Sequence, residues 1–386
     1  MVHKFLTMTF IWLLLKVIGF LFTAIILWYL ASPVFGAKAS KAELQKYAES
    51  AQYQEQRFVN IRPIDMGFSF EDMSSLLGDY WSSRKVARPP VPIPVQKVDL
   101  NHWFDSNSEG FAGTEYVWLG HSTFLLRIEQ THILIDPMFS QVPSPSPFLG
   151  GKRFSEELPF DPQNLQAVDL VLISHDHYDH LDYHSIKLLS AKVNQFVVPL
   201  GIGGHLKRWG VASEKIIELD WWDEFSTASV NLTLTPAQHF SGRALADRFH
   251  TLWGSWAIKG SSEAIFFSGD SGYAPHFKEI GEQLGPFDIA FMEAGQYNKR
   301  WPDVHMFPDQ TYQAAKDIRA KAVMPIHWGA FSLAMHPWQE PAELLKSNAE
   351  KDTIQVIIPE IGQRTRLDSL TVTTMDPWWT RIQEPK

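Results

Sequence analysis

The stretch 174–180, with the sequence SHDHYDH, limits what this chain can fold into more than any other feature. Three histidines and two aspartates lie within it. It directly follows the apolar run 169–173 (DLVLI), which has the length and β-branched content of a buried strand. Imidazole and carboxylate groups are ligands that a divalent metal such as zinc prefers, and a protein core seldom accepts them without partners. The stretch therefore predicts a metal site at the carboxyl end of a strand.

Composition narrows the chemistry further. With 386 residues, the chain has room for one large catalytic domain and additional segments. The absence of cysteine excludes disulfides, thiolate–zinc sites and a cysteine nucleophile, so the metal ligands must be His, Asp or Glu. The net charge of −9 argues against nucleic acid as the main partner. The 15 Trp and 26 Phe predict a large aromatic core, with an enzyme that works at a lipid surface as the alternative.

The amino-terminal segment is apolar over residues 5–31, apart from Thr7, Thr9, Lys16 and Thr23. Residues 10–31 exceed the roughly 20 residues that a membrane-spanning helix needs, and Lys16 can extend its amine toward the interface. We therefore predict an uncleaved membrane anchor in residues 1–36. A cleaved signal peptide is the alternative, because small residues follow the apolar segment at Ser32, Gly36 and Ala37.

The side of the membrane does not follow from charge, because lysines flank the apolar segment on both sides. An amino-terminal signal anchor with a short leading segment commonly places the following domain on the trans side. We therefore expect a periplasmic catalytic domain in a bacterium, with the cytoplasmic face as the alternative. We also expect that deletion of residues 1–36 spares folding and metal binding, because all predicted ligands lie at or after His175.

The rest of the chain divides into three predicted regions. Residues 37–110 are expected to form a linker and an irregular wrapping segment, with at most a short solvated helix in the polar part 38–56. The proline-rich run 88–94 is expected to be extended. Residues 111–370 are predicted to form the domain that contains the metal site, and residues 371–386 a carboxyl-terminal tail.

The domain predicted over residues 111–370 alternates strand-like and helical patterns. We expect strands at 115–119, 123–128, 132–136, 169–173, 195–198, 232–235, 255–258, 264–268, 288–292, 322–326 and 354–357. Helices are expected at 183–189, 276–284, 309–319 and 341–348. Such an order predicts two sheets that pack face to face with helices outside them.

Three of these predicted strands end in further ligand-type residues. They are His239, Asp270 and His327, and glycine at 269 lets the backbone carry the Asp270 carboxylate into a tight site. A single such histidine is more often an ordinary core residue, but three strand-end ligands in addition to the first cluster favour a metal centre. Together they supply enough nitrogen and oxygen donors for two metals about 3.5–4 Å apart with a shared bridging group.

The cluster, together with His239, Asp270 and His327, resembles the signature of the metallo-β-lactamase superfamily. Within it, the chain resembles the phospholipases D that hydrolyse N-acylphosphatidylethanolamine. The similar segments lie in order between about residues 115 and 365: WLGHST (118–123), DPMFS (136–140), LISHDHYDHLDY (172–183), IELDWW (217–222), LWGSW (252–256), GDSGY (269–273), GPFD (285–288) and IHWGAF (326–331).

The resemblance implies an α+β fold, a four-layer αβ/βα sandwich, with an amino-terminal transmembrane helix added in this chain. It also implies two zinc ions per chain. By its positions, His175, His177 and His239 hold the first ion, Asp179, His180 and His327 hold the second, and Asp270 bridges both. Asp179 and Asp270 are the implied catalytic residues.

Four further positions are interpreted with the same resemblance. Tyr178 and His305 match positions that contact the phospholipid, and an exposed loop histidine is the alternative for His305. Asp176 has no ligand role and is expected to be solvated. His121 is expected to support the ligands or the local structure.

The implied reaction is hydrolysis of N-acylphosphatidylethanolamine-like phospholipids to N-acylethanolamine and phosphatidic acid. Zinc would lower the pKa of a bridging water, so that a hydroxide attacks phosphorus. The implied partners are the membrane and a phospholipid substrate within it, with a possible homodimer and no nucleic acid.

Several alternatives stay open. The same site suits a lactonase or another acyl hydrolase, or a broader phosphodiesterase that acts on soluble diesters. A nuclease is disfavoured because no basic tract accompanies the negative net charge. A membrane-tethered binding protein with a structural metal is disfavoured because such sites are closed and usually rich in cysteine.

Overall fold

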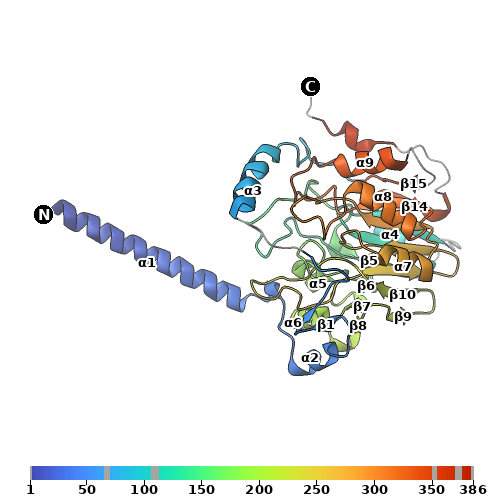
Figure 1. The fold of residues 1–386 in the computed structure, drawn as a ribbon, viewed down its shortest axis with the longest axis horizontal. Coiled ribbons are helices and arrows are strands. Elements are labelled where there is room, and N and C mark those ends of the chain that lie inside the picture. Colours follow the sequence, from blue (N-terminus) through green and yellow to red (C-terminus); the bar gives the residue numbers. More distant parts are fainter. Residues whose placement is uncertain (1, 65–69, 106–112, 350–353, 370–375, 384–386) are drawn as a thin grey trace.

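The protein is described by a computed structural model that covers residues 2–64, 70–105, 113–349, 354–369 and 376–383. Helix α1 (Val2–Ala31) extends away from the remainder of the chain (Figure 1). Its segment Phe10–Ala31 has a mean hydropathy of 2.5 and is not buried in the protein, although Trp28 and Tyr29 near its end contact Phe35. By length and composition, this segment suits a membrane span, as the sequence predicts.

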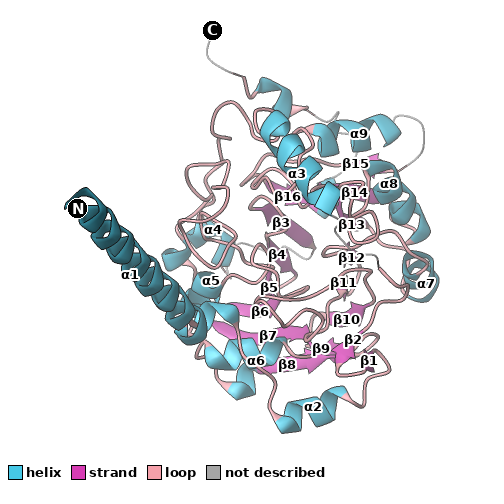
Figure 2. Cartoon of the chain, turned by 60° about the vertical axis from the view of Figure 1, so that its left-hand side comes forward, coloured by secondary structure: helices cyan, strands magenta, loops and turns pink. Residues whose placement is uncertain are grey.

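Two seven-stranded sheets form the centre of the domain (Figure 2). The first contains, in order, β16 (Arg364–Arg366), β3 (Thr114–Trp118), β4 (Phe124–Ile128), β5 (Thr131–Ile135), β6 (Val168–Leu172), β7 (Val193–Pro199) and β8 (Ile216–Leu219). The second contains β15 (Gln355–Val356), β14 (Ala322–Ile326), β13 (Ile289–Glu293), β12 (Ala264–Phe267), β11 (Ser255–Lys259), β10 (Asn231–Thr235) and β9 (Glu224–Ser226). Every predicted strand overlaps one of these.

The two sheets repeat one pattern of strand directions. In the first, the pairs from β16 to β5 are antiparallel and the pairs from β5 to β8 are parallel. In the second, the pairs from β9 to β12 are antiparallel and those from β12 to β15 are parallel. The two sheets therefore share one topology, except that the edge strand β16 of the first sheet comes from the carboxyl end of the chain; no internal sequence repeat is evident.

Alternation along the strands separates the layers. In β3, Tyr116 and Trp118 point into the core between the sheets, where Phe124 and Phe291 stack with ring centroids 4.2 Å apart. Val117, between them, joins a second core under α5 (Tyr183–Leu189) and α6 (Ile202–Arg208). On the other sheet lie α7 (His276–Gln283), α8 (Pro308–Asp317) and α9 (Glu340–Ala349). The predicted four-layer sandwich and aromatic core are confirmed.

The amino-terminal wrapping segment is more regular than predicted. It contains the hairpin β1 (Tyr53–Gln54) and β2 (Arg57–Phe58) and the helices α3 (Phe70–Ser83) and α4 (Leu100–Phe104). Asp99 caps α4 by accepting hydrogen bonds from two backbone amides. A capping residue of this kind is not detected by a search for hydrophobic periodicity. The expectation of irregular structure within residues 37–110 is therefore wrong for these parts.

Helix α2 (Lys41–Tyr47) confirms the short helix expected within 38–56. Ser40 and Glu43 form a capping box at its start, while Tyr47 at its end is buried, so the helix is solvated on one side only. Helix α6 and strands β8, β9 and β16 were not predicted. The two adjacent glycines of α6 lower its helix propensity, so tertiary packing rather than local preference forms it.

The segment that leaves α1 packs on the domain. The indole Nε1 of Trp209 donates to the carbonyl oxygen of Pro33 at 2.7 Å, and Nε of Arg243 donates to that of Val34 at 3.1 Å. The boundary expected at residue 36 therefore falls inside a packed segment. The boundaries expected at 110/111 and 370/371 fall at or within stretches outside the described residues.

Candidate metal centre

The ligand-type side chains lie at strand ends on one edge of the sandwich. His175 to His180 occupy the loop between β6 and α5, and His239, Asp270 and His327 follow β10, β12 and β14. At Gly269, φ is 55°, and a Cβ would lie 2.8 Å from that of Ser174, so only glycine allows the β12 end to approach the cluster loop. Both halves of the chain thus supply groups to a single site.

One group of potential ligands contains His175, His177, His239 and Asp270, whose ligand atoms all lie within 4.8 Å of one another. Nδ1 of His177 lies 2.9 Å from Nε2 of His175 and 3.2 Å from Nε2 of His239. Oδ2 of Asp270 lies 3.7 Å from Nε2 of His175 and 3.8 Å from Nε2 of His239. This group contains the four residues that the sequence assigns to the first metal.

The second group contains Asp179, His180 and His327, and the structure adds His121 to it. Oδ2 of Asp179 lies 3.3 Å from Nε2 of His180 and 3.1 Å from Nε2 of His327. Asp270 reaches this group as well, with Oδ1 at 3.2 Å from Nε2 of His180 and Oδ2 at 3.2 Å from Nε2 of His327. Asp270 therefore lies between the two groups, where a bridging carboxylate is expected.

The ring nitrogens that face away from the centre are held by neighbours. Nδ1 of His180 lies 2.7 Å from Oδ2 of Asp136, and Nδ1 of His239 lies 2.9 Å from the carbonyl oxygen of Val304. Nδ1 of His327 lies 3.2 Å from Oε1 of Glu293. A histidine whose outer N–H donates to a carboxylate or carbonyl directs its other nitrogen to the metal, so this pattern is typical of ligands.

The inward-facing atoms fit a divalent cation. Nε2 of His180 and Oδ1 of Asp270 are fully buried and have no hydrogen bond within the described structure. Native proteins seldom leave such atoms unsatisfied unless an ion or water completes them. Nitrogen and carboxylate donors of this kind suit zinc and other borderline divalent metals.

Electrostatics favours the ligating protonation states of Asp270 and of the His175 and His239 rings. Burial lowers the pKa of His175 and His239, so both imidazoles are neutral. Burial alone raises the pKa of Asp270, but the charge of His180 and that of His327 outweigh it and hold the pKa well below the usual range. Ionised Asp270 and neutral His175 and His239 are the forms that bind a metal. Burial alone lowers the pKa of His180 and of His327, but the charge of Asp270 and other nearby carboxylates raises both, so metal binding at these two rings must release their protons.

Asp176 departs from the sequence-based expectation. It is not solvated but buried, and Oδ1 accepts a hydrogen bond from the Gly242 amide at 2.7 Å. Its Oδ2 accepts from the Thr251 hydroxyl at 3.0 Å and lies 3.3 Å from Nε2 of His205. The expectation was wrong because the partners lie 29 to 75 positions along the chain, where local sequence gives no sign of them.

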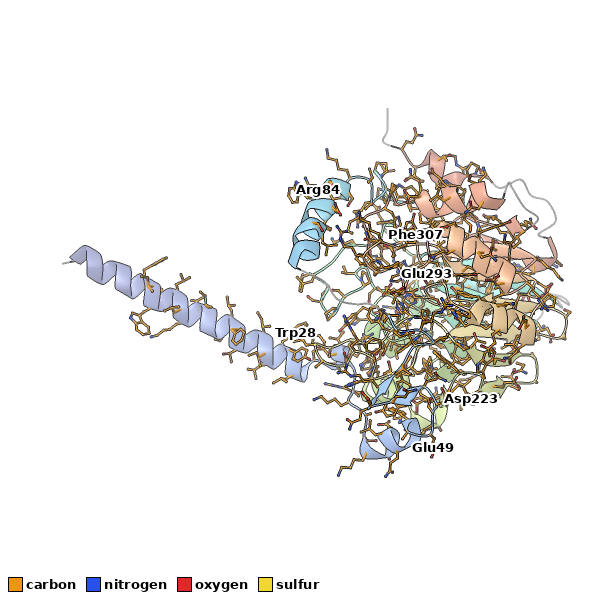
Figure 3. All side chains as sticks on the ribbon, in the orientation of Figure 1. Trp28, Glu49, Arg84, Asp223, Glu293 and Phe307 are labelled. Carbon is orange, nitrogen blue, oxygen red and sulfur yellow. The ribbon has the colours of Figure 1, made fainter. Side chains whose placement is uncertain are left out.

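A cleft of about 290 Å³ opens over the two groups. His305 lies in its wall, stacked on His327 with ring centroids 5.3 Å apart, and its Nδ1 pairs with Oε1 of Glu293. The remaining lining residues are His177, Asp179, Phe240, Arg248, Asp270, Gln296, Trp301, Val304 and Leu333. In Figure 3, Glu293 lies within the domain, well away from Trp28 at the base of α1.

Tyr178 points elsewhere. It does not line the cleft, and its hydroxyl donates to the carbonyl oxygen of Arg243 at 2.6 Å.

Sequence reasoning missed Arg248 and Glu293. Glu293 is the last residue of an apolar strand, and Asp136 directly follows another, so the position at a strand end could have identified Glu293. No local sequence feature identifies Arg248.

The strand order and the carboxylate-bridged histidine groups define a metal-dependent hydrolase of the metallo-β-lactamase fold. The model of the beta-lactamase superfamily domain matches residues 131–328, and the chain belongs to this superfamily. An uncharacterised protein of Mycobacterium tuberculosis is 38% identical over 347 residues, covering 88% of this chain and 91% of its own length.

Within the superfamily, the chain is also similar to N-acyl-phosphatidylethanolamine-hydrolyzing phospholipase D 1 of Caenorhabditis elegans. The two are 35% identical over 268 residues, covering 66% of this chain and 73% of the relative. Among solved structures, Igni18, a metallo hydrolase of Ignicoccus hospitalis, is 21% identical with a TM-score of 0.50, covering 66% of this chain and 97% of its own. That structural likeness shows the fold.

Proposed function

We propose that this protein is a binuclear zinc phosphodiesterase of the phospholipase D type. It hydrolyses N-acylphosphatidylethanolamine-like phospholipids to N-acylethanolamine and phosphatidic acid. The main observation in support of a two-metal site is the position of Asp270 between two histidine-rich groups, where one carboxylate can serve both metals. The similarity to the nematode phospholipase D supports the choice of substrate.

In this proposal, His175, His177 and His239 hold one zinc ion, Asp179, His180 and His327 hold the other, and Asp270 contacts both. A bound zinc pair supplies a water that is acidic near neutral pH and positive charge for the phosphoryl oxygens in the transition state. Asp136, Glu293 and the Val304 carbonyl keep the ligand rings oriented through their outer nitrogens.

The cleft walls suit a phosphodiester with an apolar part. Arg248 contributes a cation at the cleft, where it can contact a phosphate oxygen, and Phe240, Trp301 and Leu333 contribute apolar surface. His305 has its Nδ1 occupied by Glu293, which leaves Nε2 for a substrate oxygen. The predicted contact of Tyr178 with substrate stays a prediction, because its hydroxyl is engaged with the backbone.

The membrane helix completes the proposal. If α1 spans the bilayer, it holds the cleft near the surface that contains the substrate and raises the effective substrate concentration. The proposed side is the trans side, which is the periplasm in a bacterium.

Hydrolysis in oxygen-18 water tests the reaction. The label should enter the phosphate of phosphatidic acid, because the attack is at phosphorus. Label in a released fatty acid or an opened lactone would instead identify an acyl hydrolase. A parallel panel of N-acyl phospholipid, bis-p-nitrophenyl phosphate, a lactone and nitrocefin, each with and without chelator, distinguishes a phospholipase from a broader phosphodiesterase.

A further inference from the structure

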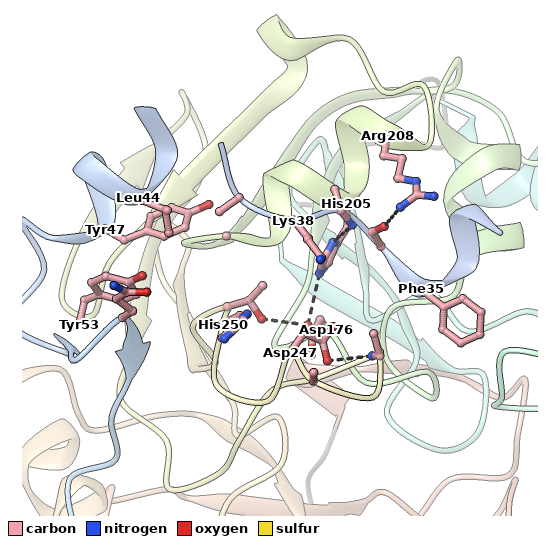
Figure 4. A pocket seen from close by; sticks show the side chains of 18 of the residues that line it. Phe35, Lys38, Leu44, Tyr47, Tyr53, Asp176, His205, Arg208, Asp247 and His250 are labelled. Atoms are coloured by element: carbon pink, nitrogen blue, oxygen red, sulfur yellow. Dashed lines mark hydrogen bonds and ion pairs between the residues drawn. The ribbon is translucent and has the colours of Figure 1, made fainter. Parts of the chain in front are cut away.

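A second cavity lies at the base of α1. Its volume is about 430 Å³, and it shares no lining residue with the metal cleft. The last turns of α1, residues 35–39, α2, α6 and the segment 244–251 contribute to its wall. Figure 4 shows Tyr47 and Tyr53 on one side of this cavity and Phe35 on the other. Its volume falls within the range of pockets that hold small ligands in other proteins.

Much of the wall is apolar and begins where the membrane span ends. Tyr29 and Leu30 belong to the last turn of the candidate span, and both line the cavity. Leu44, Tyr47 and Tyr53 continue the apolar surface away from α1. An aliphatic chain that leaves the bilayer beside α1 would therefore meet apolar surface rather than water.

The polar part of the wall contains two cations, Lys38 and Arg208, that form no ion pair: among the described residues, no carboxylate lies within ion-pair distance of either. Arg208 donates only to backbone carbonyls, those of Gly36 and Ser32. The carboxylates of the wall, Asp176 and Asp247, instead accept bonds from backbone amides.

We propose that this cavity binds an amphiphile with one aliphatic chain and an anionic head, a carboxylate or a phosphate, taken from the adjacent membrane leaflet. The head group contacts Lys38 and Arg208, and the chain lies along Leu44, Tyr47 and Tyr53. A lipid with a neutral head group cannot pair with these cations, and a free anion cannot contact the apolar surface, so both should bind more weakly.

The cavity is connected to the metal-ligand loop. Nδ1 of His205 accepts a bond from the Ala37 amide at 2.8 Å, and its Nε2 donates to Asp176, which lies between His175 and His177. Gly36 packs so closely on this ring that a Cβ would lie 2.3 Å from Nδ1. An amphiphile in the cavity therefore lies against residues that hold the ligand loop from behind.

Equilibrium binding to the full-length protein in non-ionic detergent tests the site without any turnover, so its outcome is independent of the proposed reaction. The probes are radiolabelled oleate and oleoyl lysophosphatidate, with monooleoylglycerol as the neutral chain and inorganic phosphate as the free head. We expect the anionic amphiphiles to bind at least tenfold more tightly than either control. If only one of the two binds, it identifies the head group.

Two variants locate the binding. Lys38→Glu should weaken the binding of the anionic amphiphiles at least tenfold, and Ala246→Phe should weaken it by filling the cavity. Lys41→Glu, the same charge change on an exposed part of α2 outside the cavity, should bind as the wild type does. Unchanged metal content and thermal unfolding confirm that the variants fold. Equal binding by Lys38→Glu and Lys41→Glu, or equally tight binding of monooleoylglycerol, overturns the proposal.

Discussion

Nε2 of His121 donates a hydrogen bond to Oδ2 of Asp179 across 2.7 Å, although the two residues lie 58 positions apart. His121 lies in the turn between β3 and β4 with φ of 55°. Its backbone amide donates to the carbonyl oxygen of Trp328, and its own carbonyl oxygen accepts from the His327 amide. His121 thereby fixes the Asp179 carboxylate and the end of β14 against each other.

Replacement of His121 by Phe should therefore lower activity about 10- to 100-fold, because Asp179 loses the donor that orients it. Burial lowers the pKa of His121 to about 3, so the wild-type ring is neutral and the variant removes no charge. Activity and metal content per chain are the measurements. His132→Phe, a change of the same kind outside the centre, should leave both unchanged. Unchanged activity in His121→Phe would refute the positioning role.

Replacement of Asp270 by Asn should lower metal content and activity together, with activity reduced on the order of 100-fold or more. One carboxylate approaches nitrogens of both groups, and a neutral amide cannot offset the charge of two cations. Elemental analysis of the purified protein should find about two zinc ions per wild-type chain and fewer in the variant. Full metal content together with full activity would show that Asp270 is not the bridge.

His305 and Glu293 should respond differently to substitution, although they pair with each other. His305→Phe should lower activity and leave metal content intact, because this ring lines the cleft and is proposed to contact the substrate. Glu293→Gln should lower both, because Oε1 of Glu293 also holds the outer nitrogen of His327. Loss of metal in His305→Phe would instead make His305 a ligand, in the group that it forms with Asp270, Glu293 and His327.

Truncation should separate anchoring from folding. A form that lacks residues 1–31 should match the full-length rate in mixed micelles, since it keeps the packed segment after α1. On intact vesicles at low lipid concentration, it should be slower by about 100-fold or more, because each encounter then starts from solution. Both rates are compared at equal metal content.

A form that lacks residues 1–36 is the informative control. It leaves the buried Arg243 guanidinium and the Trp209 indole without the carbonyl acceptors of Val34 and Pro33. Each lost acceptor costs about 1–3 kcal/mol, so the midpoint of thermal unfolding should fall. The expectation that deletion to residue 36 spares folding is therefore revised. If the form that lacks residues 1–31 were as active on vesicles as the full-length protein, the domain would bind the membrane by its own surface.

The proposed orientation can be read from protease sensitivity. In spheroplasts of a bacterium that expresses the full chain, an added protease should digest the catalytic domain, because that domain is proposed to lie on the trans side. A cytoplasmic marker protein must survive the same treatment. A catalytic domain that stays intact until the spheroplasts are lysed would lie in the cytoplasm.

The metal ligands were predictable from sequence because they lie close together in one loop or shortly after predicted strands. Residues 175–180 carry their donors within one loop, and His239, Asp270 and His327 each follow an apolar strand. Strands β10, β12 and β14 run in the same direction, so their carboxyl ends lie at one edge of the second sheet, and packing of the two sheets brings the loop after β6 to the same place. The same reasoning correctly placed every predicted strand of the sandwich.

The supporting contacts were not predictable in this way. The bond of His121 to Asp179 and the engagement of Asp176 by Thr251 depend on loops that meet only after the sheets have packed. Arg248 reaches the cleft from a segment without periodic pattern. The packing of Pro33 and Val34 on Trp209 and Arg243 spans more than 170 positions and follows from shape and hydrogen bonding, which composition does not encode.

The repeated strand pattern has a consequence for how the protein holds together. The first half of the sandwich contributes His175 to His180, the second contributes His239, Asp270 and His327, and neither half has a complete set of ligands. Metal can therefore bind tightly only when the halves are docked, so its binding free energy adds to the free energy of unfolding. Chelation should therefore lower the unfolding temperature, because the two halves then lose the metal that joins their ligands.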